Sequence, residues 1–182
     1  MNLGIPQREH TALLVIDIQE RLMPVIFEND KVFANANKLL RGAEILGLET
    51  IITEQYPKGL GHTCQEIQLP EDPNIIEKVC FSSLLSEAVS EQLKLTNVKS
   101  LIVCGVESHI CVLKTTLDAL KAGYEVHVVA DAVSSRSAEN KHLALERMRQ
   151  SGAFITSVEM ILFMLLDNAG TDEFKAISKL IK

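Results

Sequence analysis

The sequence predicts an α/β fold with a doubly wound, six-stranded parallel sheet of order 3-2-1-4-5-6 and helices on both faces. Three observations support this prediction. Short apolar runs alternate with segments of helical periodicity along the chain. Parallel strands require crossover connections, and the helices in those connections cover both faces of the sheet. Finally, the 182 residues contain no low-complexity tract or obvious linker, so we expect one domain spanning residues 1–182.

Six short apolar runs predict the strands. Each run is bounded by polar residues, Gly or Pro, and the first one ends directly before Asp17. In chain order the predicted strands are 11–16, 49–53, 74–78, 99–104, 125–130 and 154–156.

Six segments between and after these runs predict helices. In the first of them, apolar residues recur every three or four positions, and Gly47 is a typical helix stop. The helix after the fourth strand has Cys111 in its first turn. In chain order the predicted helices are 32–46, 83–95, 110–122, 137–151, 158–166 and 173–181.

The stretch 54–72 shows no clear helix or strand pattern and contains two glycines and two prolines. A structureless loop of this length is typical of a functional lid or of a disordered segment. Because it leaves the carboxyl end of the second strand, where α/β folds place their ligands, we expect it to border a pocket.

Composition excludes several classes of function. A net charge of −6 without a basic cluster argues against nucleic acid or an anionic membrane as the main partner. The longest apolar stretch, 160–166, is far shorter than the roughly 18 residues of a membrane span. The first residues lack the apolar segment of a secretory signal. Cysteines at 64, 80, 104 and 111 form no CxxC pair, which favours a reducing, cytoplasmic location.

Two chemically useful residues follow strands that the predicted order makes neighbours. Asp17 follows the first strand and Cys111 follows the fourth, on either side of the point where the chain reverses direction. The first turn of a helix favours a negative charge, and a thiolate is the reactive form of cysteine. The alternative interpretation is that Cys111 is a small apolar residue that fills space.

A reactive thiol needs a base and a stabilising charge. Asp17 is the preferred base, since burial at the end of an apolar strand raises a carboxyl pKa; alternatively it caps a turn. His109 is the second candidate, but residues two apart on a helix do not face each other. Lys78, at the end of the third strand, would stabilise a thiolate; alternatively it is a solvated surface lysine.

Five segments in sequence order carry a resemblance to a known family: 14–19, 53–61, 78–82, 105–112 and 129–136. On these motifs the chain resembles the isochorismatase-like cysteine hydrolases, which include nicotinamidases and carbamoyl-amide hydrolases. The resemblance covers about residues 11 to 181. The segment 53–61 is most similar to the metal-free branch of isochorismatase domain-containing proteins.

The resemblance implies a catalytic triad of Asp17, Lys78 and Cys111. It also implies an oxyanion hole formed by the backbone N–H groups of Glu107 and Cys111, a cis peptide bond between Val106 and Glu107, and a homo-oligomer. The residues predicted to line the pocket and contact substrate are Gln19, Gln55, Tyr56, Phe81 and His109.

We expect neither a metal nor a cofactor. Nicotinamidases hold their metal through an acidic residue and histidines after the second strand, whereas residues 53–57 of this chain lack an Asp-x-His arrangement. The prediction is therefore a metal-free cysteine hydrolase that cleaves a C–N bond in a small amide-like molecule through a thioester. The alternative is a binding or scaffold protein that keeps the hydrolase fold without turnover.

Overall fold

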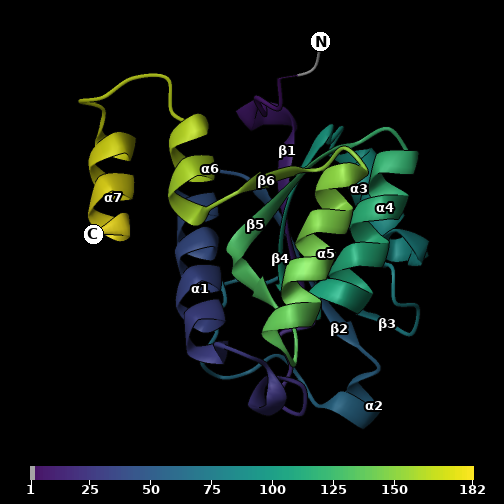
Figure 1. Ribbon diagram of the computed structural model, residues 1–182. Coiled ribbons are helices and arrows are strands. Elements are labelled where there is room, and N and C mark those ends of the chain that lie inside the picture. Colours follow the sequence, from purple (N-terminus) through teal and green to yellow (C-terminus); the bar gives the residue numbers. More distant parts are fainter. Residues whose placement is uncertain (1–2) are drawn as a thin grey trace.

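The computed structural model describes residues 3–182, and its six strands form one parallel sheet of order β3-β2-β1-β4-β5-β6 (Figure 1). The predicted fold class and strand order are confirmed. The strands are β1 Thr11–Ile16, β2 Glu49–Gln55, β3 Ile75–Lys78, β4 Ser100–Val106, β5 Glu125–Ser134 and β6 Phe154–Thr156.

Seven α-helices and several short turns connect the strands in the described part of the chain. The α-helices are α1 Asn29–Leu46, α2 Pro57–Leu60, α3 Glu87–Leu95, α4 Leu113–Lys121, α5 Ala138–Gln150, α6 Val158–Met164 and α7 Asp172–Ile181. The 3₁₀ turns are Arg8–His10, Met23–Val25 and Ser83–Leu85, and a π-helical turn covers Ser108–Val112. None of the helices within residues 3–182 is both long and apolar enough to cross a bilayer.

An apolar layer covers each face of the sheet. Along β1 alternate side chains point to opposite faces, so Leu13 and Val15 join one layer and Leu14 and Ile16 the other. The first layer includes residues of α1, α6 and α7, and the second includes residues of α3, α4 and α5. Figure 1 shows these two sets of helices on opposite sides of the strands.

β1 and β4 approach each other closely where β1 ends. Gly105 pairs with Ile16 across the two strands and has a φ of +111°, a conformation that residues with a side chain rarely adopt. A Cβ atom at Gly105 would lie 2.0 Å from the carbonyl oxygen of Ile16. A glycine is therefore required here, directly behind the two strand ends that carry Asp17 and the Cys111 turn.

Some predicted boundaries were wrong near the carboxyl edge of the sheet. β2 continues to Gln55, since the polar residues at its end are buried and not in the loop. The helix predicted at 110–122 begins only at Leu113, after the π-helical turn that contains Cys111. The helix predicted at 83–95 is a 3₁₀ turn followed by α3.

The segment predicted as a structureless loop contains α2 and is tied to the residues that follow β1. The N–H of Glu20 donates to the carbonyl of His62 at 3.0 Å, and the N–H of Cys64 donates to that of Ile18 at 2.9 Å. The buried carboxylate of Glu54 accepts hydrogen bonds from the N–H and hydroxyl of Thr63. These bonds fix the loop beside the carboxyl edge.

Candidate active site

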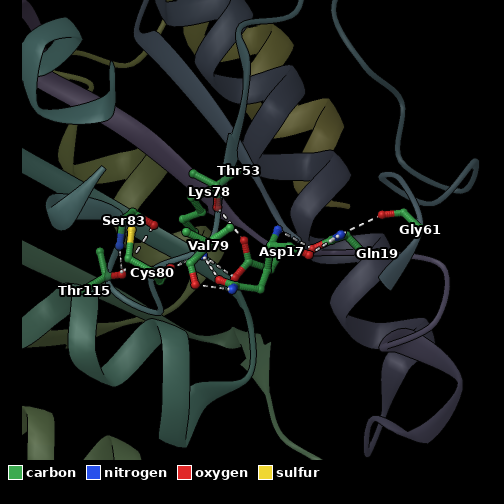
Figure 2. Close-up of polar contacts among 10 residues, drawn as sticks. Asp17, Gln19, Thr53, Gly61, Lys78, Val79, Cys80, Ser83 and Thr115 are labelled. Atoms are coloured by element: carbon green, nitrogen blue, oxygen red, sulfur yellow. Dashed lines mark hydrogen bonds and ion pairs between the residues drawn. The ribbon is translucent and has the colours of Figure 1, made fainter. Parts of the chain in front are cut away.

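A buried ion pair stands at the carboxyl edge of the sheet. The ammonium group of Lys78 lies 2.7 Å from Oδ2 of Asp17, and both side chains have an exposed fraction of 0%. The hydroxyl of Thr53, two residues before the end of β2, donates to Oδ1 of Asp17 at 2.7 Å. Figure 2 shows these three side chains meeting from three neighbouring strands. A charge so fully removed from water is stable only with such partners.

Cys111 belongs to the same cluster. The thiol lies close enough to both charged groups for the Asp17 carboxylate to raise its pKa and the Lys78 ammonium to lower it. α4 is held to the segment after β3 by Ser83, whose N–H donates to the hydroxyl of Thr115 at 2.9 Å, one helical turn after Cys111. The structure thus brings together the three side chains of the predicted triad.

The pKa values of Asp17 and Cys111 are both raised. Burial raises the pKa of Asp17, although the Lys78 ammonium and the hydrogen bonds of Lys78 and Thr53 oppose this shift. Burial and the neighbouring Asp17 charge raise the pKa of Cys111 to about 12, against the opposing effect of Lys78. The expectation that the helix start lowers this pKa is therefore wrong, because desolvation outweighs it.

The two pKa shifts bear on the protonation of the resting site. A thiol with a raised pKa keeps its proton at neutral pH, and a carboxylate with a raised pKa is a stronger base than a free aspartate. Cys111 therefore rests as a neutral thiol.

Gln19 and Gln55, predicted as substrate contacts, already hold other parts of the chain. The amide of Gln19 accepts from the N–H of Gln55 and donates to the carbonyls of Gln55 and Gly61. The amide of Gln55 accepts from Lys78 at 2.8 Å and donates to the carbonyl of Val79 at 2.7 Å. Their polar atoms fasten the end of β2 and orient Lys78.

Tyr56 and Phe81 are both exposed. Tyr56 lines a cavity of about 480 Å³ whose wall also includes Lys78, Cys80 and Leu85. Phe81 is not among the residues that line this cavity.

The turn before Cys111 carries the remaining predicted features. The peptide bond between Val106 and Glu107 is cis, as the resemblance implied. The N–H groups of Ile110 and Val112 donate to the carbonyl of Glu107, so neither is available for a substrate oxygen. This leaves the predicted oxyanion-hole donors, the amides of Glu107 and Cys111, to be tested.

His109 bonds to a residue at the end of β5. Its Nδ1 lies 2.9 Å from the hydroxyl of Ser135, which argues against its role as the base for Cys111. Next to it, Arg136 pairs with the carboxylate of Glu107 at 2.7 Å. Thr53, Ser135 and Arg136 were not predicted. The available signals were the position of Thr53 at the end of the predicted strand and in the motif 53–61, and those of Ser135 and Arg136 in the motif 129–136.

No group of three or more His, Cys, Asp or Glu side chains within residues 3–182 is arranged to hold a metal ion. At the end of β2, where metal-binding relatives carry their ligands, Glu54 pairs with His62 at 2.9 Å and also bonds to Thr63. Hydrogen bonds from Thr63 and His62 outweigh burial and keep the pKa of Glu54 below its usual value. This carboxylate serves to close the loop.

Comparison with known proteins gives consistent matches. The model of the isochorismatase domain matches residues 11–160. The secreted isochorismatase effector Isc1 of Phytophthora sojae is 45% identical over 179 residues, covering 94% of this chain and 84% of that protein.

Two solved structures are similar over almost the whole chain. The MAR1 ribonuclease of Caenorhabditis elegans has a TM-score of 0.91 at 40% identity, covering 96% of this chain and 91% of that one. The YcaC gene product of Escherichia coli, described as an octameric hydrolase of unknown specificity, has a TM-score of 0.92 at 27% identity, with 100% and 91% covered.

Proposed function

The chain belongs to the isochorismatase family, and from this premise we propose that it is a cysteine hydrolase that cleaves a C–N bond in a small amide-like substrate. The resemblance predicted from the motifs is confirmed, and the fold is that of a family hydrolase. The observation that carries the proposal is the buried pair of Asp17 and Lys78, whose charges both act on the thiol of Cys111.

The proposed reaction is an acyl transfer. Asp17 takes the proton of Cys111 while the sulfur attacks the substrate carbonyl carbon, and Lys78 offsets the charge on this cluster. The backbone N–H groups of Glu107 and Cys111 bind the tetrahedral oxyanion, where one donor is typically worth about 2.7–4 kcal/mol. The leaving amine takes the proton back from Asp17, and water then hydrolyses the thioester. Gln19 and Gln55 support Lys78, and Tyr56 and Phe81 face the substrate.

Detection of the covalent intermediate tests this proposal. We expect intact-mass measurements to show an adduct after exposure to amide and aldehyde libraries, and Cys111→Ser to show none. The protein is exposed to RNA in the same way, because one similar protein is named a ribonuclease. If no library yields an adduct or turnover, while Cys111→Ala alters the binding of a partner, the protein is a scaffold and the proposal fails.

We also propose that the protein is a homo-oligomer. The exposed apolar side chains of Tyr56, Val79 and Leu85 line the cavity at the β3 edge, and one similar hydrolase is described as octameric. Light scattering coupled to size exclusion is expected to give a multiple of the 20.1 kDa chain mass. A mass of one chain at micromolar concentration would contradict this. The cytoplasmic location stays a prediction, since one relative is named as secreted.

A further inference from the structure

The carboxylate of Glu107 is held by Arg136, a residue 29 positions later at the end of β5. Three nitrogen atoms of Arg136 donate to this carboxylate: the backbone N at 3.2 Å, Nε at 3.1 Å and one terminal guanidinium nitrogen at 2.7 Å. The side chain of Glu107 is 5% exposed, whereas that of Arg136 is 58% exposed. Bidentate pairs of this kind fix both distance and orientation.

We propose that Arg136 is a positioning residue for the nucleophile: through Glu107 it anchors the turn that carries Cys111, and it offsets the negative charge that Glu107 places beside the thiol. This inference rests on the proposed function, because it assigns a role at the same site. Arg136 acts through Glu107 and is not proposed to touch the substrate.

Glu107 connects Arg136 to the turn that carries Cys111. Its carbonyl accepts the N–H groups of Ile110 and Val112 and thereby shapes the turn around Cys111. Its side chain is bonded to Arg136 on the neighbouring strand end. A second link, between His109 and Ser135, runs parallel to it. The position of the thiol is thus set from β5 as well as from its own strand.

The charges around Cys111 also support this role of Arg136. The charged and titratable groups around Cys111 are Asp17 after β1, Lys78 on β3 and Glu107 after β4, with His109 3.9 Å from the Glu107 carboxylate. The negative charge of Glu107 raises the pKa of Cys111. A guanidinium bonded to that carboxylate reduces its field at the sulfur, because opposite charges in contact act at a distance as a dipole.

Alkylation of Cys111 by iodoacetamide, followed by peptide mass mapping across neutral to alkaline pH, tests this role. Arg136→Met is expected to shift the rate profile to higher pH by about half a unit, which slows the reaction about threefold at neutral pH. The double variant Arg136→Met/Glu107→Gln is expected to return to the original profile or below it, since both charges are gone. Arg136→Lys keeps a positive charge and should stay close to the wild-type profile.

Arg149→Met is the matched control, because Arg149 is also 58% exposed and is paired with Glu146 at 2.8 Å on α5. It should leave the profile unchanged. A profile unaffected by Arg136→Met, or a double variant as slow as the single one, would overturn the inference. Should Arg136→Met fail to fold, Arg136→Gln decides, since it keeps hydrogen-bond donors but loses the charge and is expected to shift the profile to higher pH in the same way. If Cys111 reacts at the wild-type rate in variants that lack Asp17 or Lys78, the proposed function itself fails.

Discussion

Asp17→Asn is expected to slow the reaction of Cys111 by about 10²–10⁴-fold, the usual contribution of a positioned general base. The same change leaves the fully buried ammonium of Lys78 without its counter-charge. Breaking a buried pair in this way destabilises a protein by about 3–5 kcal/mol, so the free energy of unfolding should fall as well. Chemical denaturation and the rate of adduct formation measure the two effects on the same samples.

The double variant Asp17→Asn/Lys78→Met separates catalysis from stability. It removes both charges from the buried site, so most of the lost stability should return while the reactivity of Cys111 stays low. Asp30→Asn, at an exposed position in the first turn of α1, is a control that should change neither quantity much. Wild-type reactivity in a folded Asp17→Asn protein would show that the carboxylate is not the base.

Gly105→Ala is expected to destabilise the protein by about 4 kcal/mol or more, since it combines overpacking with an unfavourable backbone conformation. The new Cβ would meet the Ile16 carbonyl oxygen at 2.0 Å, a backbone atom that cannot move without separating β1 from β4. Thermal unfolding and the yield of soluble protein measure the outcome.

Gly47→Ala is the matched control for this prediction. Gly47 also has a positive φ, at the end of α1, but nothing lies within 4 Å of an added Cβ. Its substitution should therefore cost about 1 kcal/mol, the strain of the left-handed conformation alone. Equal losses in the two variants would mean that the close approach of β1 and β4 is not what requires Gly105.

The parts of the fold that depend on apolar patterning could be predicted from the sequence. Thr11–Ile16 and Phe154–Thr156 have the predicted bounds, and the strand order follows from the alternation of strands and helices. The end of β2 was missed because Glu54 and Gln55 are polar, and polarity in a sequence indicates a loop. Here both side chains are buried: Glu54 accepts hydrogen bonds from Thr63, and Gln55 accepts one from Lys78.

The site could be predicted only in part. Asp17, Lys78 and Cys111 follow strands or end them, and parallel strands bring such positions to one edge. The pKa of Cys111 could not be predicted, because it depends on burial and on the distance to Asp17. The pair of Glu107 and Arg136 could not be predicted either. These residues are distant in sequence, and the pairing of β4 with β5 brings them together.

The sheet order also bears on when the site comes into being during synthesis. Asp17 emerges from the ribosome 61 residues before Lys78, and the sulfur-bearing turn follows later still. Until β4 inserts beside β1, β1 is the edge of a partial sheet β3-β2-β1 and one of its sides is unpaired. A nascent or truncated polypeptide that ends before β4 therefore lacks the sulfur, and its first strand has one edge open to wrong partners.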